Sequence, residues 1–166
     1  MKKLTLCAAA VTALVASTSH AAPGDVQLVG YVSPVCEVSG LNTQLLDFGS
    51  VTSANQQVGI NMDFQCNDVD GATVTLTSAE GGLESDDDED FALTYTALFT
   101  PGSITPALQL NAPGGPGQND VSVSQSYGGS SSLATGVTAS LLVTTTEAAT
   151  WAGGYSDTLT VNVTSN

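Results

Sequence analysis

Apolar and polar residues alternate along most of the chain with a period of two. The clearest run covers residues 58–66, where every second residue is apolar and the last of them is Cys66. Strict alternation of this kind indicates a β-strand with one buried face. The same pattern recurs in four further runs, at residues 72–77, 91–99, 137–143 and 155–163. We therefore predict an all-β domain whose alternate Val, Leu and Phe side chains point into one core.

Glycine and proline separate these runs. Residues 81–82, 101–102 and 113–117 consist of Gly and Pro and predict turns or loops, and we expect the Ser- and Gly-rich stretch 122–132 to be a loop as well. Short alternating strands joined by frequent turns are typical of a β-sandwich or a β-barrel. The sequence shows no internal repeat and no second domain.

The first 21 residues resemble an export signal. Two lysines at positions 2 and 3 are followed by an apolar run from position 4 to 16 and then by small residues, which is the order found in a secretory leader. The apolar run is shorter than the about 20 residues that a membrane-spanning helix needs. We expect cleavage after Ala21, export of the remaining 145 residues, and no insertion into a membrane.

Loss of this leader would leave a strongly acidic chain without basic side chains. The full sequence has a formal net charge of −14 from sixteen Asp and Glu residues and two lysines. Lys2, Lys3 and the only histidine, His20, all lie in the leader, so the formal charge of the mature chain becomes −16. Nucleic acids and anionic lipids are bound through Lys and Arg. Neither is therefore expected as a partner.

Two cysteines, Cys36 and Cys66, follow the leader. An even pair in an exported chain predicts one disulfide. Two free buried thiols are the alternative. A structural zinc site is disfavoured because neither a histidine nor a third cysteine follows the leader to complete it.

The composition also argues against catalysis. General acid–base and nucleophilic catalysis rely mainly on His, Lys or a free thiolate, and the mature chain would have none of them. We predict a protein that is not an enzyme and that has no cofactor. The catalytic alternative is a glycan hydrolase that uses two carboxylates in one cleft.

Residues 84–90 form an acidic run with six carboxylates in seven positions. Asp86, Asp88 and Asp90 have the spacing with which an EF-hand calcium loop begins. However, Phe91 stands where that loop needs Gly, and Ala97 where it needs a bidentate Glu. We expect a solvated loop, with weak Ca²⁺ binding at the three aspartates as the alternative.

The segment directly after the leader also alternates. Val26, Leu28, Gly30 and Val32 occupy one phase, and the residues between them occupy the other. The pattern predicts a strand. That strand is either an ordinary first strand of the domain or an arm that adds to the sheet edge of another copy, and alternation alone favours the first.

Four short motifs change this balance. They are Pro-Val-Cys-Glu-Val at 34–38, Leu-Asp-Phe-Gly at 46–49, Asp-Phe-Gln-Cys at 63–66, and Gly-Gly-Tyr-Ser-Asp-Thr at 153–158 followed by an alternating strand. Their order resembles the spore coat U domain, which is shared with subunits of archaic, Csu-type chaperone–usher pili. The closing Gly-x-Tyr-Ser-Asp-Thr strand, together with the paired cysteines, is the most specific part of the resemblance.

The resemblance implies an immunoglobulin-like β-sandwich over residues 33–166 that lacks its final strand. In such pilins a periplasmic chaperone lends a strand to the open groove, and an outer-membrane usher then exchanges it for the N-terminal segment of the next subunit. Here the donated segment would be residues 22–32. Its pocket-filling candidates are Val26, Leu28 and Val32, with Gly30 at a shallow point, and the acceptor groove would be lined through the closing strand by Tyr155, Leu159, Val161 and Val163.

We therefore expect a structural subunit of a bacterial surface pilus that is exported through the periplasm and serves adhesion or biofilm formation. Its expected partners are copies of itself or related subunits, the chaperone and the usher. The alternative is a free-standing secreted β-sandwich that binds a ligand through the acidic, Ca²⁺-dependent loop.

Overall fold

A computed structural model describes residues 26–41, 44–87 and 91–166. The chain divides into two units, Met1–Val32 and Ser33–Asn166. The predicted leader lies outside the described residues. In the first unit, residues 26–32 form no helix or strand, and their large apolar side chains are exposed, namely those of Val26, Leu28, Val29, Tyr31 and Val32. The strand expected here thus has no ladder partner within the described chain.

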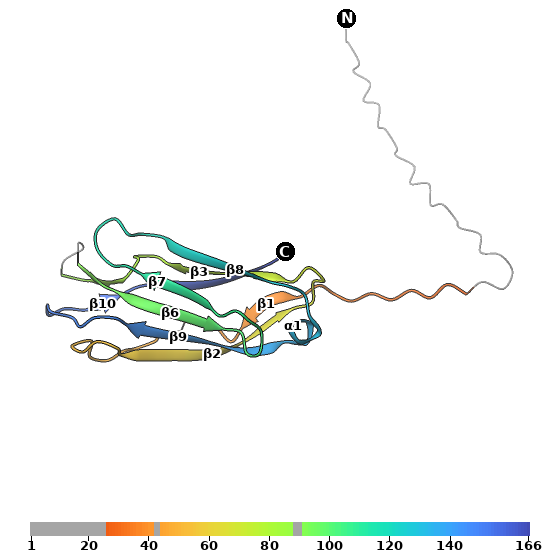
Figure 1. Ribbon diagram of the computed structural model, residues 1–166, viewed down its shortest axis with the longest axis horizontal. Coiled ribbons are helices and arrows are strands. Elements are labelled where there is room, and N and C mark those ends of the chain that lie inside the picture. Colours follow the sequence, from red (N-terminus) through yellow and green to blue (C-terminus); the bar gives the residue numbers. More distant parts are fainter. Residues whose placement is uncertain (1–25, 42–43, 88–90) are drawn as a thin grey trace, which may run out of the picture. The chain divides into compact units, whose positions relative to one another are not determined.

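The regular secondary structure of the second unit is almost entirely antiparallel β-strand (Figure 1). This confirms the predicted all-β class. The strands are β1 (Cys36–Ser39), β2 (Gln57–Cys66), β3 (Ala72–Ser78), β4 (Leu83–Ser85), β5 (Ala92–Leu93), β6 (Tyr95–Thr100), β7 (Leu108–Ala112), β8 (Val121–Tyr127), β9 (Val137–Thr145), β10 (Tyr155–Ser156) and β11 (Leu159–Ser165), with one short helix, α1 (Ser131–Thr135).

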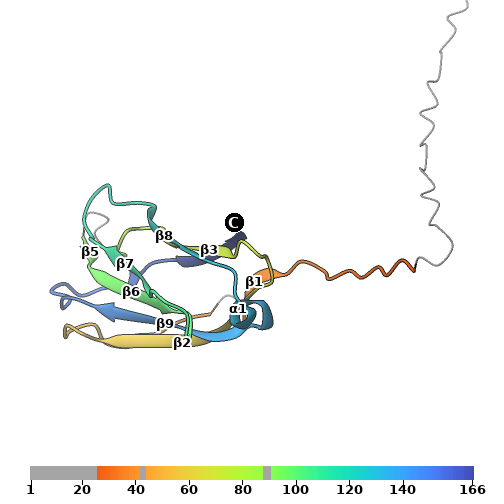
Figure 2. The same ribbon diagram turned by 45° about the vertical axis from the view of Figure 1, so that its right-hand side comes forward.

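The strands form two main sheets and one small one. The first main sheet has the order β1-β2-β9-β6-β7, the second has the order β11-β3-β8, and the small sheet has the order β10-β4-β5. Figure 2 shows that the five-stranded sheet curls around one side of the core while the three-stranded sheet lies on the other. The two main sheets approach each other where β7 meets β8, and β1 lies beside β11 at the opposite margin. The immunoglobulin-like topology stays a prediction, since this arrangement alone does not establish it.

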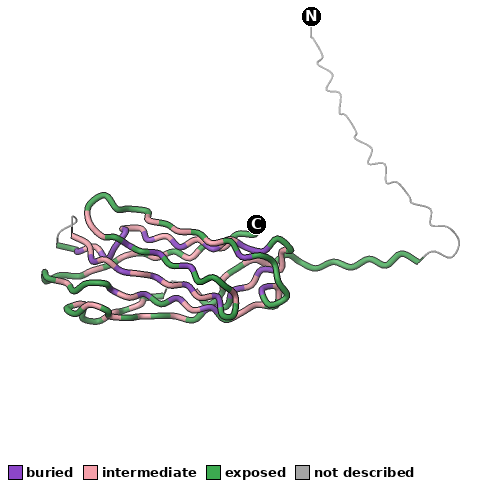
Figure 3. The backbone as a smooth tube through the Cα atoms, viewed as in Figure 1, coloured by how far each residue is buried: buried purple, intermediate pink, exposed green. Residues whose placement is uncertain are grey.

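Burial alternates along the strands as the period of two predicts (Figure 3). In β3 the inward positions Ala72, Val74, Leu76 and Ser78 are fully buried, and the threonines between them face outward. At the centre of the core, Phe64 packs edge-on against two other aromatic rings, those of Phe99 and Tyr127, with centroids 5.9 Å away in each case. Aromatic contacts of this geometry add to the stabilisation from apolar burial.

The run predicted at 91–99 divides between two sheets. β5 pairs with β4 in the small sheet, whereas β6 pairs with β7 and β9 in the large one. Thr94 forms the corner. Its backbone N–H donates to a carboxylate oxygen of Glu147 over 2.9 Å, and its hydroxyl bonds to that of Thr146. These hydrogen bonds hold Thr94 at the point where the chain crosses from the small sheet to the large one.

The loop predicted at residues 122–132 is confirmed only for residues 128–130 and is wrong for the residues on either side. Residues 121–127 form β8, in which serines face outward and Val123 and Tyr127 face inward. Ser130 then caps α1, because its side chain accepts a hydrogen bond from the backbone N–H of Leu133. The serines are weak strand formers, and pairing with β3 overrides that preference.

The predicted disulfide between Cys36 and Cys66 is confirmed. It joins β1 to the end of β2, where the two residues are directly paired. Next to it, Asn67 holds the incoming chain: its side chain accepts from the N–H of Val35 over 2.8 Å and donates to the carbonyl of Ser33 over 2.7 Å. The point at which the chain enters the second unit is therefore fixed both covalently and by hydrogen bonds.

Candidate functional site: an open groove beside β11

β11 is an edge strand with an incompletely covered apolar face. Within the described residues it pairs on one side only, with β3. Its inward side chains, Leu159, Val161 and Val163, are only half-buried, although the inward residues of the neighbouring β3 are fully buried. An edge strand of this kind presents unpaired backbone N–H and C=O groups. The core is therefore closed over β3 and left open beyond β11.

The opposite wall shows the same feature in β2. β1 pairs only with residues 63–66 of β2, so the first half of this strand has no paired strand on that side among the described residues. Met62 and Phe64 are buried, whereas Val58 and Ile60 are half-buried. The two uncovered strand halves face each other across the core.

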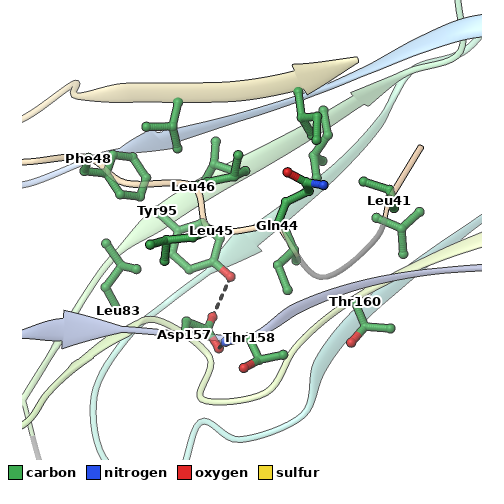
Figure 4. A pocket seen from close by; sticks show the side chains of 16 residues that line it. Leu41, Gln44, Leu45, Leu46, Phe48, Leu83, Tyr95, Asp157, Thr158 and Thr160 are labelled. Atoms are coloured by element: carbon green, nitrogen blue, oxygen red, sulfur yellow. Dashed lines mark hydrogen bonds between the residues drawn. The ribbon is translucent and has the colours of Figure 1, made fainter. Parts of the chain in front are cut away.

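Between them lies a groove with a volume of about 490 Å³ (Figure 4). Most of its lining is aliphatic. We use "groove" for this hollow, which is lined by Leu41, Gln44, Leu45, Leu46, Phe48, Val58, Ile60, Leu83, Tyr95, Leu141, Val143, Asp157, Thr158, Leu159, Thr160 and Val161.

The structure places two of the four predicted acceptor residues on the groove wall, Leu159 and Val161. Val163 lies further along β11, outside the lining. Tyr155 belongs to β10, where its ring packs against Phe91 with centroids 6.2 Å apart. Its hydroxyl donates to the carbonyl of Trp151 over 2.8 Å. The groove is thus formed by the first half of β11 and not by the whole closing strand.

One end of the groove is polar. There the Asp157 carboxylate accepts hydrogen bonds from the hydroxyls of Ser78 and Tyr95 over 2.5 and 2.6 Å, and from the backbone N–H groups of Glu80 and Thr158 over 3.0 and 2.6 Å. Figure 4 shows the Tyr95 hydroxyl directed at this carboxylate. Tyr95 and Asp157 line the groove, whereas Ser78 is fully buried and lies outside the lining. We call these three residues the polar end of the groove.

This environment changes the acidity of Tyr95. Burial of the ring raises the pKa of its hydroxyl above the ordinary value, and the hydrogen bond to the Asp157 carboxylate raises it further. Burial also raises the pKa of Tyr127. Both tyrosines therefore keep their protons in the folded protein at a pH at which the unfolded chain loses them.

We expect the free energy of unfolding to fall as the pH rises above about 10, the ordinary pKa of tyrosine. In that range the folded state binds more protons than the unfolded state, so the slope is negative, at most about 1.4 kcal/mol per pH unit for each tyrosine. Urea titrations between pH 8 and 11.5 measure this slope. Tyr95→Phe should reduce it and leave the contribution of Tyr127, and an unchanged slope in Tyr95→Phe would contradict the account of Tyr95.

The remaining candidates are not among the residues that line the groove. The predicted donor residues Val26, Gly30 and their neighbours are exposed in the first unit. Among the calcium candidates only Asp86 is described, and its carboxylate accepts from the N–H of Gly154 over 2.7 Å; Asp88 and Asp90 lie outside the described residues. In the part of the chain that is described, no cluster of three potential metal ligands occurs, and no helix is long and apolar enough to cross a membrane.

Sequence reasoning did not assign the polar end to the site. Asp157 belongs to the Gly-x-Tyr-Ser-Asp-Thr motif and has the same alternation phase as Leu159 and Val161. The sequence could therefore have predicted that Asp157 lies on the groove side. Ser78 and Tyr95 come from distant strands, and only the pairing of β11 with β3 brings Ser78 beside this carboxylate. No local sequence pattern indicates that Ser78 and Tyr95 contribute to the site.

No protein-family model matches the chain, and no curated protein matches its sequence. The resemblance to spore coat U domains and to pilus subunits therefore rests on the sequence motifs.

Proposed function

We propose that this protein is a structural subunit of a bacterial surface pilus, exported through the periplasm and assembled by donor-strand exchange. The arm, residues 22–32, would fill the groove of the next copy and complete an immunoglobulin-like sandwich. The observation that carries this proposal is the half-open core between β11 and β2 in a chain whose residues 26–32 are exposed and bear apolar side chains. Residues 22–25 of the arm lie outside the described residues. Adhesion or biofilm formation is the role that such a fibre would serve.

Strand insertion has a clear driving force. The edge of β11 offers backbone groups to a new strand, and each hydrogen bond formed contributes about 1 kcal/mol net. Burying the side chains of Val26 and Leu28, which are 82% and 92% exposed, adds about 1.5–3 kcal/mol each. Insertion also shields Leu159 and Val161 from water. An open apolar edge invites aggregation, so a chaperone strand would occupy the groove before assembly.

The position of the chain entry suggests the direction of the inserted strand. Ser33 and Cys36 lie near Asn67, at the end of the fold where β11 finishes and Asn166 bonds to Gly71. An arm that runs antiparallel to β11 leaves the groove at the opposite end. Each joint then brings two different ends together, and such head-to-tail contacts generate open fibres.

The groove lining favours this function over the alternatives. A two-carboxylate hydrolase needs both carboxylates in one cleft, whereas Asp157 is the only carboxylate among the described residues that line the groove. A small-ligand site has polar groups that converge on the ligand. Here the carboxylate already accepts four hydrogen bonds from the protein itself. A groove with aliphatic walls and an unpaired strand edge suits an extended peptide better.

Deletion of residues 22–32 tests the proposal. The mature chain should form a ladder of multimers that survives detergent without heating, and the deleted chain should be monomeric because it has no strand to donate. A synthetic peptide of residues 22–32 should then bind the deleted chain. At 100 times its dissociation constant it would stabilise the fold by about 2.7 kcal/mol, which raises the melting temperature by about 5–10 °C.

A peptide of the same composition in scrambled order is the control and should leave the melting temperature unchanged. The proposal fails if the deleted chain still forms the ladder, or if the arm peptide does not stabilise it.

A further inference from the structure

We infer that the polar end of the groove fixes the register of the inserted arm, because it accepts only Gly30 opposite Asp157. This inference rests on the proposed strand exchange. It adds which arm residue meets which groove residue, and it makes Asp157 a residue that determines specificity.

The groove has room for three inward-facing arm positions. Along β11 its lining runs from Asp157 to Val161, a length of about 13 Å at the rise of a strand. Within that length the half-buried side chains are those of residues 157, 159 and 161, whereas Thr158 and Thr160, which also border the groove, are exposed. Beyond Val161, β1 lies beside β11, and this limits the groove on that side.

The position opposite Asp157 differs from the other two. The carboxylate already accepts hydrogen bonds from Ser78, Tyr95 and two backbone N–H groups. A bulky apolar side chain above it would displace water from a charged group and would offer no partner in return, which is unfavourable. An arm residue without a side chain avoids this conflict. Leu159 and Val161, in contrast, are apolar and suit apolar partners.

Gly30 is an arm residue without a side chain. Nothing within the same chain requires a glycine at this position. A Cβ atom built on Gly30 meets nothing within 4 Å, and its backbone is not in the left-handed region that favours glycine. It is the only residue without a side chain in the apolar phase of residues 26–32. In antiparallel pairing, Gly30 opposite Asp157 brings the two preceding residues of this phase, Leu28 and Val26, opposite positions 159 and 161.

The neighbouring registers are both unfavourable. Sliding the arm by two residues in one direction places Leu28 over Asp157, and sliding it in the other places Val32 there. The second shift also moves Val26 past the groove towards β1. Shifts by one residue would turn Val29 and Tyr31 inward and again place a side chain over the carboxylate. The assigned register is the one that leaves this position empty.

Cysteine cross-linking at exposed positions tests the register. Gln27 lies in the outward phase of the arm and falls opposite Thr160 in the assigned register. Thr160 is exposed, and so are the two comparison positions, Asn162 in β11 and Thr158 just before this strand. Directly paired strand residues are close enough for a disulfide. Under mild oxidation, Gln27→Cys with Thr160→Cys should give linked multimers at least tenfold faster than Gln27→Cys with either comparison variant.

The outcomes separate the register from the proposed function. Fastest linking at Thr158 or Asn162 would overturn the register and leave strand exchange standing. Absence of linked multimers at all three positions would overturn strand exchange and the register with it.

Two substitutions confined to the arm provide a second test, since they do not touch the folded second unit. Gly30→Leu should weaken binding of the arm peptide to the arm-deleted chain at least 100-fold, because the new side chain meets the polar end. Val32→Ser should change binding less than threefold, because the assigned register places Val32 beyond that end and so removes it from the pocket-filling residues expected from the sequence. Unchanged peptide binding with Gly30→Leu, or a large loss of peptide binding with Val32→Ser, would contradict the register.

Discussion

A carboxylate placed at Val161 is expected to abolish the multimer ladder. Val161 lies on the groove wall and is only half-buried in the single chain, so an aspartate there remains hydrated and the subunit should still fold. An inserted arm would bury that charge without a partner, at a cost of about 3–5 kcal/mol. Because 1.4 kcal/mol corresponds to a factor of ten, the arm should bind more than 100-fold more weakly. Analytical ultracentrifugation and unheated gels measure the multimers.

Asn162→Asp is the matched control for Val161→Asp. It adds the same charge one residue away, on the exposed outer face of β11, where no strand would cover it. Multimers should form as in the parent protein. Equal behaviour of the two variants would show that the groove side of β11 has no special role.

Removal of the disulfide is expected to cause the second large effect. Replacing Cys36 and Cys66 by alanine opens a loop of 30 residues, which in the chain-entropy model costs about 3–4 kcal/mol and lowers the melting temperature by about 10 °C. β1 should be the first element to detach, because its four residues pair only with β2. In a fibre any pull on the arm would reach the second unit through Ser33 and this disulfide.

The measurement should be made on the chain without residues 22–32, so that strand exchange does not add to the stability. Urea unfolding gives the free energy, and hydrogen exchange at residues 36–39 reports on β1. A change below about 1 kcal/mol would mean that hydrogen bonds such as those of Asn67 hold the chain entry by themselves.

Alternation predicted the long strands β2, β3 and β9, whereas β7 and β8 were not predicted as strands. Residues 58–66 and 72–77 were predicted almost to the residue, because every second side chain in them is buried and the others are polar. β8 was missed because its outward positions are all serine, and the long run at 91–99 hid the corner at Thr94. In both cases pairing with distant strands decided the structure, and local preference did not.

The groove was foreseen less completely than the strands. Leu159 and Val161 follow from the closing-strand motif, but the opposite wall does not. Val58 and Ile60 have the same pattern in the sequence as the buried Met62 and Phe64. Val58 and Ile60 are less buried because β1 ends before it reaches them. No residue in β2 indicates where β1 ends. The polar end likewise depends on three side chains that are far apart in the sequence.

The central claim is that one copy fills the groove of another with its arm, and mixing two variants tests it directly. Leu28→Asp prevents the arm from inserting but leaves the groove able to bind an arm. Val161→Asp prevents the groove from binding an arm but leaves the arm able to insert. Each variant alone should be monomeric. Native mass spectrometry of the mixture should show a heterodimer of one copy of each, with no longer species, because only one arm and one groove remain functional. Multimers formed by either variant alone, or a mixture that stays monomeric, would contradict the account.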